Sequence, residues 1–277
     1  MNKKFAELAK KSKVIVIKVG SNILVNEKHS LRKKWLASLV EDVQKLQRKG
    51  SKIIIVSSGA IALGRKILSK KKLTNLHEKQ AAASIGQIQL SQEWQKAFAK
   101  CKIQSSQILI TAEDLNERRK YLNIRNTIYS LMDLNVVPII NENDTTSTEE
   151  IRFGDNDKLS AMIANVLSAE LLILLSDVNG LYTSNPKKSA QAKLITSVEE
   201  VNQQIEKYID KDLSEFGSGG MLAKVNAAKL CIQSGSTMII SNGLVNSPLG
   251  NIHPKSSTWF LPSKNILTSR QQWIWNR

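Results

Sequence analysis

The chain has 277 residues, which is enough for one large α/β domain or two small ones. Hydrophobic residues make up 42% of it and charged residues 23%, a composition that excludes an intrinsically disordered protein. The longest apolar run, 171–175, is far shorter than the roughly 20 residues that span a bilayer. Residues 1–13 also lack the apolar core of a secretory signal. We therefore expect a cytoplasmic protein that does not associate with membranes.

Basic residues exceed acidic ones by 40 to 24, which gives a net charge of +16. They are scattered along the chain, with short runs such as those at 70–72 and 118–120, and they do not alternate with aromatic residues as in RNA-binding motifs. We therefore do not expect nucleic-acid binding, since a lysine-rich surface or an anionic small substrate explains the excess. Two distant cysteines and three isolated histidines predict reduced thiols and no metal held by the protein.

The first half of the chain alternates buried strands with amphipathic helices. Uninterrupted apolar runs predict the strands, and apolar residues at helical spacing predict the helices. In chain order we expect a strand over 14–17, a helix over 31–49, a strand over 53–56, a helix over 78–100, a strand over 108–111, a helix over 121–134 and a strand over 136–140.

The second half begins with a polar segment, 145–153, which we expect to form a hairpin or flap. After it we expect a helix that opens at 154–157 and runs to 168, a strand over 171–175, helices over 199–209 and 221–233, a strand over 237–240 and an edge strand over 258–261. The alternation predicts one domain with a mainly parallel sheet and helices on both faces. Ligands of such sheets bind at the carboxyl ends of the strands. We therefore expect the polar loops that follow the strands to converge on one cleft, among them those at Gly20, Ser58, Asn141 and Asp177.

Two lysines stand beside glycine turns. Lys18 ends the first expected strand just before Gly20, and a lysine there is costly to bury unless an anion meets it. Lys224 follows the glycine loop 217–220 at the start of a helix, where backbone N–H groups and a lysine suit phosphate oxygens. A snorkelling lysine and a plain surface loop are the respective alternatives.

Neither glycine-rich segment fits a common nucleotide motif. Residues 59–66 come near the Walker pattern, but Arg65 and Lys66 replace its lysine and its magnesium-binding hydroxyl residue. The loop 217–220 fails the dinucleotide pattern because Leu222 holds the place of the last glycine. We therefore expect neither an ordinary P-loop nor a Rossmann site.

Acidic and amide side chains are densest in two segments, 141–144 and 154–157. Carboxylates bind ammonium groups or metals, and carboxamides interact with both ends of a zwitterion. Ordinary turn chemistry is the alternative, because Asn and Asp are favoured in loops. The spacings typical of calcium loops, serine hydrolases and zinc proteases are absent from the sequence.

Taken together, these segments resemble the glutamate 5-kinases of the amino-acid kinase superfamily. The resemblance extends from about residue 14 to about residue 261 and rests on residues 17–21, 56–64, 79–83, 141–144, 152–157 with 159–161, 177–182 with 185–186, and 219–221 with Lys224. It implies a three-layer αβα sandwich with a mainly parallel central sheet. It also implies a single kinase domain over 1–277, without the C-terminal PUA domain that many members carry.

The implied activity is transfer of the γ-phosphoryl group of ATP to the side-chain carboxylate of L-glutamate. The product would be L-glutamyl 5-phosphate, made in the first step of proline biosynthesis. A carboxylate nucleophile is already ionised at neutral pH, so the reaction needs no general base, and Mg²⁺ would be carried by the nucleotide. We expect L-proline to act as a feedback inhibitor and the protein to form a homo-oligomer.

The resemblance also assigns roles to residues. Lys18 and Lys224 would be catalytic, with Asp157 orienting them. The substrate-binding residues would be Ser58, Asp144 and Asn156, together with Asn141 from the same cluster. The nucleotide-binding residues would be Lys18, Gly20, Ser176, Asp177, Ser218, Gly219, Gly220, Met221, Leu222, Ala223 and Lys224.

Two alternatives remain open at this point. One is another member of the superfamily, such as an acetylglutamate kinase, a uridylate kinase or an aspartokinase. Ser58 and the pair Asp144 and Asn156 favour a substrate with a free α-amino group. The other is a basic regulatory or nucleic-acid-binding protein that kept the fold without catalysis. The intact Lys18, Asp157 and Lys224 argue against this alternative.

Overall fold

A computed structural model describes residues 1–70, 72–147, 156–186, 188–210 and 220–262 of the chain. Within these ranges the strands form one eight-stranded sheet in the order β3-β4-β2-β1-β5-β7-β8-β6. All neighbouring pairs are parallel except β7 and β8. The strands are β1 (Val14–Val19), β2 (Lys52–Ser57), β3 (Ser105–Ile110), β4 (Val137–Glu142), β5 (Leu171–Ser176), β6 (Ser197–Val198), β7 (Thr237–Asn242) and β8 (Ser257–Phe260).

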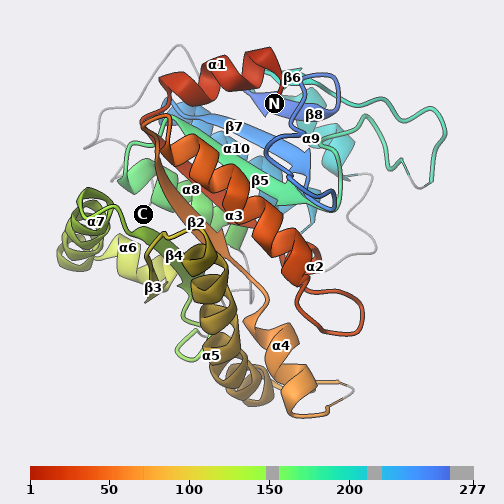
Figure 1. Ribbon diagram of the computed structural model, residues 1–277. Helices are drawn as coiled ribbons and strands as arrows, with labels where there is room; N and C mark the ends of the chain where they lie inside the picture. Colours follow the sequence, from red (N-terminus) through yellow and green to blue (C-terminus); the bar gives the residue numbers. More distant parts are fainter. Residues whose placement is uncertain (71, 148–155, 187, 211–219, 263–277) are drawn as a thin grey trace.

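Helices cover both faces of the sheet, and Figure 1 shows α1 and α3 in front of it with α8 and α10 behind. Buried hydrophobic side chains form two clusters. The helices that contribute to the first cluster are α1 (Lys3–Lys11), α2 (Ser21–Leu24), α3 (Lys33–Gln47), α4 (Ala60–Ile67) and α5 (Leu76–Lys100). Those that contribute to the second cluster are α6 (Ala112–Asn116), α7 (Arg118–Asp133), α8 (Asn156–Val166), α9 (Gln203–Asp210) and α10 (Met221–Gln233). Two hydrophobic cores on opposite faces confirm the three-layer αβα sandwich.

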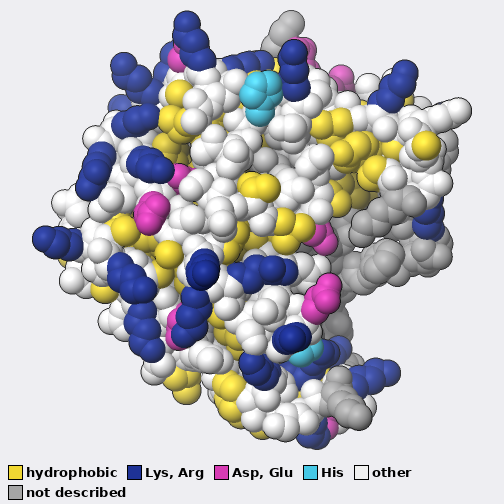
Figure 2. Space-filling view, turned by 45° about the vertical axis from the view of Figure 1, so that its right-hand side comes forward, with side chains coloured by type: hydrophobic (Ala, Val, Ile, Leu, Met, Phe, Trp, Pro, Cys, Tyr) yellow, Lys and Arg dark blue, Asp and Glu magenta, His cyan; other side chains and the backbone are white. Residues whose placement is uncertain are grey.

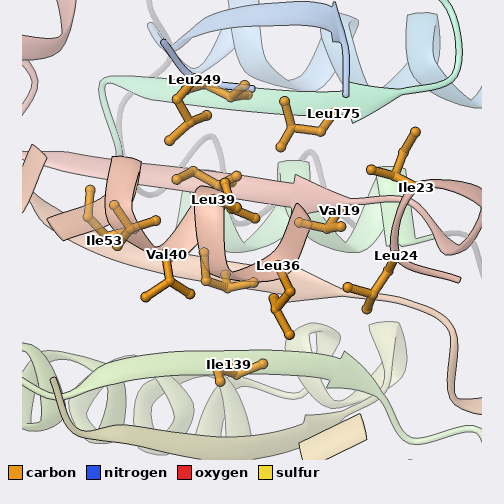
Figure 3. Close-up of a cluster of buried hydrophobic side chains, with 14 of the residues drawn as sticks. Val19, Ile23, Leu24, Leu36, Leu39, Val40, Ile53, Ile139, Leu175 and Leu249 are labelled. Atoms are coloured by element: carbon orange, nitrogen blue, oxygen red, sulfur yellow. The ribbon is translucent and has the colours of Figure 1, made fainter. Parts of the chain in front are cut away.

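The alternation of side chains along the strands explains the two cores. In β1, Ile17 and Val19 belong to the first cluster and Val16 to the second. Figure 3 shows Leu36 and Leu39 of α3 packed in the first cluster. Because successive side chains point to opposite faces, Lys18 shares the face of Val16 and points toward the layer that contains α8.

Most expected elements are confirmed, and the helix over 221–233 agrees with α10 at both ends. The edge position expected for the strand over 258–261 is wrong, because β6 pairs with β8 and forms the edge instead. The strand expected over 108–111 begins earlier, since β3 contains polar residues from Ser105 onward. Polar side chains are tolerated there because β3 is itself an edge strand, with much of it exposed.

Helix boundaries differ in two further places. The helix expected over 121–134 begins at Arg118, and the helix expected over 199–209 begins only at Gln203, after β6. Four short or polar helices, α1, α2, α4 and α6, have no counterpart in the sequence prediction. The expected hairpin or flap over 145–153 lies mostly outside the described residues.

Helices α4 and α5 pack unusually closely. A Cβ atom on Gly86 would lie 1.9 Å from the carbonyl oxygen of Ala60, and one on Gly64 would lie 1.8 Å from that of Ala82. Only glycine fits at these two contacts, so residues 59–66 serve to bring two helices together. The residue before α4, Gly59, has a left-handed backbone with φ 109°, which glycine adopts without strain.

The surface agrees with the scattered basic residues of the sequence. On the face shown in Figure 2, Lys and Arg side chains are spread among uncharged ones, with few acidic side chains between them. In the part of the chain that the structure describes, no helix combines the length and apolar character needed to cross a bilayer.

Candidate active site

The loops after β1, β2, β4 and β5 meet at the carboxyl edge of the sheet, as the sequence predicts. The backbone N–H of Gly20 donates to the carbonyl of Leu175, at 3.3 Å. The side chain of Asn156 reaches both Ser58 and Asn141. The sheet extends from β1 toward β2 on one side and toward β5 on the other, so this edge contains the switch point where such folds bind ligands.

A buried aspartate joins the two predicted catalytic lysines. Nζ of Lys18 lies 2.5 Å from Oδ1 of Asp157, and Nζ of Lys224 lies 3.0 Å from Oδ2. All three residues are buried: Lys18 is 8% exposed, Asp157 2% and Lys224 8%. Lys18 comes from β1, Asp157 from the first turn of α8 and Lys224 from the first turns of α10. Three distant segments thus bring two positive charges and one negative charge together.

The ionisation of Asp157 follows from this arrangement. Burial alone would raise the pKa of its carboxyl group, but the ammonium groups of Lys18 and Lys224 outweigh burial and hold the pKa below its ordinary value. The carboxylate therefore remains charged and orients both lysines. These three side chains carry a net charge of +1, which favours an anion beside them.

Gly20 leaves room beside this cluster. Its φ of −69° is open to any residue, so the backbone does not require glycine. A Cβ atom would, however, lie 3.9 Å from Nζ of Lys18. The absence of a side chain keeps space open for a group that approaches the ammonium.

Amide side chains form a second buried network. Nδ2 of Asn156 lies 2.7 Å from Oγ of Ser58, 3.1 Å from Oδ1 of Asn141 and 3.3 Å from the carbonyl oxygen of Ser57. Asn141 in turn donates to Oε1 of Gln87, at 2.8 Å. Three of the four predicted substrate-binding residues are therefore in one hydrogen-bonded group.

Two buried oxygen atoms of the predicted substrate-binding residues accept no hydrogen bond within the described residues. They are Oδ1 of Asn156 and Oδ1 of Asp144, the fourth predicted substrate-binding residue. Burial, and then the nearby charge of Glu142, raise the pKa of Asp144 from 3.8 to about 7. A buried acceptor without a donor costs free energy, so these oxygens are suited to a ligand that supplies N–H groups.

The predicted nucleotide-binding residues that the structure describes lie at the ends of β1 and β5 and at the start of α10. Oγ of Ser176 donates to Oδ1 of Asp177 at 3.3 Å. Gly220 is the N-cap of the 13-residue helix α10 and supplies no capping side chain. Met221, Leu222 and Ala223 form the first turn, whose backbone N–H groups suit phosphate oxygens. Ser218 and Gly219 lie outside the described residues.

The sequence did not indicate Gln87 or Ser57 as part of the site. Gln87 lies in the middle of α5, 54 residues from the Asn141 that it contacts. Ser57 contributes a backbone carbonyl oxygen, which any residue would supply. Among the described residues, no group of three or more His, Cys, Asp or Glu side chains could hold a metal ion.

The comparisons with known proteins agree with this architecture. The sequence profile of the amino acid kinase family matches residues 13–242. Because this match covers most of the chain, the protein belongs to the amino acid kinase family. Within this family it belongs to the glutamate 5-kinases.

The assignment to glutamate 5-kinases rests on curated relatives. The chain is 49% identical over 267 residues to the glutamate 5-kinase of Pelagibacter ubique, covering 96% of this chain and 73% of that protein. It is 43% identical over 265 residues to the glutamate 5-kinase of Paramagnetospirillum magneticum, with coverage of 95% and 72%.

Solved structures with the same fold are more distant in sequence. The carbamate kinase from Giardia lamblia bound to AMP-PNP has a TM-score of 0.63 at 18% identity, covering 92% of this chain and all of that one. The UMP kinase from Ureaplasma parvum has a TM-score of 0.60 at 17% identity, with the same coverage. At this identity the likeness shows the fold alone.

Proposed function

We propose that this protein transfers the γ-phosphoryl group of ATP to the side-chain carboxylate of L-glutamate. The product is L-glutamyl 5-phosphate, and the reaction is the first step of proline biosynthesis. The relatives named glutamate 5-kinase support this activity. The observation that carries it is that two buried acceptors, on Asp144 and Asn156, have no donor among the described residues and lie at the same edge of the sheet as the two buried lysines.

The acceptors bind the α-ammonium group of glutamate. An ammonium group has three N–H donors, and Oδ1 of Asp144 and Oδ1 of Asn156 accept two of them. Ionised Asp144 also neutralises the positive charge, which compensates for burying both groups. The hydroxyl of Ser58, which accepts from Asn156, helps to position the substrate at the end of β2.

Lys18 and Lys224 stabilise the charge that develops during phosphoryl transfer. Attack by a carboxylate on ATP brings two anions together, so the reaction depends on fixed positive charge more than on covalent chemistry. Asp157 holds the two ammonium groups at 2.5 and 3.0 Å from its oxygens, and this fixes their positions before the substrates arrive. The acceptor carboxylate needs no general base because it is already ionised.

The nucleotide binds along the ends of β1 and β5 and the start of α10. Gly20 provides space beside Lys18, and the uncapped N–H groups of α10 meet phosphate oxygens. Mg²⁺ accompanies the ATP phosphates, where it neutralises charge on the transferring group. Ser176 and Asp177 contribute polar groups at the end of β5.

Trapping of an acyl phosphate with hydroxylamine tests the proposed activity. The purified protein is incubated with ATP, Mg²⁺, hydroxylamine and L-glutamate, N-acetyl-L-glutamate or L-aspartate, and UMP phosphorylation is measured separately. We expect hydroxamate with L-glutamate and at least about a hundredfold less with N-acetyl-L-glutamate, because acetylation removes the charge that Asp144 pairs with. Equal rates with both glutamates, or phosphorylation of UMP instead, would reject the proposal.

L-Proline should inhibit this reaction in competition with L-glutamate. Proline carries a secondary ammonium with two N–H donors, which matches the two acceptors that find no donor among the described residues. It has no side-chain carboxylate to phosphorylate. Initial rates are measured against glutamate at several proline concentrations. We expect high glutamate to relieve the inhibition completely, and inhibition that glutamate does not relieve would indicate a separate proline site.

A further inference from the structure

We infer that Gln87 is a positioning residue that sets the affinity for the amino-acid substrate by holding Asn141 and, through it, Asn156. The inference rests on the proposed function and concerns the same site. Gln87 belongs to α5, whereas Asn141 ends β4 and Asn156 begins α8. The three side chains thus link a helix of one layer, the sheet and a helix of the other layer.

The orientation of the two asparagine amides follows from backbone groups. The N–H of Glu142 donates to Oδ1 of Asn141 at 2.9 Å, so the amide oxygen of Asn141 faces that donor and Nδ2 faces Gln87. Nδ2 of Asn156 lies near that same oxygen and near the carbonyl of Ser57, both of which only accept. The amide of Asn156 is therefore turned so that its Oδ1 has no donor from the described part of the chain.

Gln87 restricts the rotation of the Asn141 side chain. Asn141 is 2% exposed, and Oε1 of Gln87 is the acceptor that the described residues offer to its Nδ2, at 2.8 Å. Without it a buried N–H group loses its partner, and rotation of the Asn141 side chain withdraws the acceptor from Asn156. Oδ1 of Asn156 would then no longer be held in line with an ammonium group.

The close packing of α4 and α5 brings Gln87 to this position. Its neighbour Gly86 lies against Ala60 in the first turn of α4, at a distance that excludes any side chain. Ser58 lies two residues before Ala60, with only Gly59 between them, and accepts from Asn156. The same contact therefore aligns both Ser58 and Gln87 with the amide network.

A loss of positioning has a specific kinetic signature. Among the described residues, Gln87 forms no hydrogen bond or ion pair with Lys18 or Lys224, so the charges that act on phosphoryl transfer stay in place. We expect Gln87→Met to raise KM for L-glutamate about tenfold, with KM for ATP and kcat changed by less than about threefold. Gln87→Glu keeps an oxygen acceptor and should restore most of the affinity.

The experiment compares five variants, Gln87→Met and Gln87→Glu among them, with the wild type by hydroxamate formation and by the shift in melting temperature that L-glutamate causes. Gln89→Met, at an exposed position on the same helix, is the matched control and should behave as wild type. Asn156→Ala and the double variant Gln87→Met/Asn156→Ala form a cycle. If Gln87 acts through Asn156, adding Gln87→Met to Asn156→Ala raises KM no further.

The outcomes separate this inference from the proposed function. If the wild type forms no hydroxamate from L-glutamate, the proposed function is rejected. If the wild type is active and Gln87→Met has the same KM for L-glutamate and the same melting shift, the inference alone is rejected. Two further results would overturn it, because a general structural role predicts both. One is a rise in KM for ATP as large as that for L-glutamate, and the other is a double variant whose KM rises by the product of the two single effects. If Gln87→Met does not fold, an unchanged KM in Gln87→Ala would overturn the inference in the same way.

Discussion

Replacing Asp144 by asparagine should stabilise the ligand-free protein and at the same time abolish its use of L-glutamate. Burial and the charge of Glu142 raise the pKa of Asp144 to about 7, so the ionised carboxylate is unfavourable in the empty site. Each unit of pKa corresponds to about 1.4 kcal/mol, so this ionisation costs at most roughly 4 kcal/mol at pH 8. Asparagine removes the cost, but it cannot neutralise an ammonium group.

The effect on stability depends on pH in a defined direction. Between about pH 4 and pH 7 the folded protein keeps a proton on Asp144 that the unfolded chain has released. The free energy of unfolding of the wild type therefore falls as pH rises through this range, and levels off above it. The advantage of Asp144→Asn should be small at pH 4 and largest at pH 8.

Substrate affinity should change with pH in the opposite sense. An ammonium ligand needs ionised Asp144, so kcat/KM for L-glutamate should rise about tenfold per pH unit below pH 7 and reach a plateau above it. Urea unfolding and initial rates from pH 5 to 8 measure both effects, with Asp133→Asn, at an exposed carboxylate ending α7, as the control. An asparagine variant that is less stable than the wild type at pH 8 would contradict the role of Asp144.

The fold could be predicted where local sequence alone dictates structure. Uninterrupted β-branched and leucine runs are typical of strands buried on both faces, and β1, β2, β5 and β7 were found from them. Short edge elements lack this signal: β6 has two residues, and β3 begins with two serines because one side of it is solvent-exposed. The boundaries of the elements next to them were predicted poorly for the same reason.

In the candidate site, too, some residues could be predicted from the sequence and others could not. Lysines beside glycine turns are visible in a sequence, because a charged group at the end of a buried strand demands an explanation. Their common partner, Asp157, was identified through the family resemblance. Gln87 could not be found, since a glutamine in a helix is ordinary and its role depends on a helix contact made by Gly86. Such residues become visible only when the hydrogen bonds of the folded protein are followed.

Replacing Lys18 or Lys224 by alanine should lower kcat by at least about a hundredfold while the protein stays folded. A preorganised positive charge at a transferring phosphoryl group is worth on the order of 3 kcal/mol of transition-state stabilisation. Each single variant leaves Asp157 paired with the other lysine, at 2.5 or 3.0 Å. The buried carboxylate thus keeps a counter-charge, and most of the stability should be preserved.

Asp157→Ala should behave differently from either lysine variant. It leaves two ammonium groups, each 8% exposed, without the carboxylate that they share. Removing the central charge of such a cluster costs about 3–5 kcal/mol of stability, in addition to the loss of activity. Urea unfolding and single-turnover rates of the three variants distinguish the roles. If Asp157→Ala unfolds like the wild type, or if both lysine variants keep near-normal turnover, the three residues do not act as one unit. If instead stability is lost mainly with Asp157 and turnover with all three, the aspartate holds the lysines in place and the lysines act on the phosphoryl group.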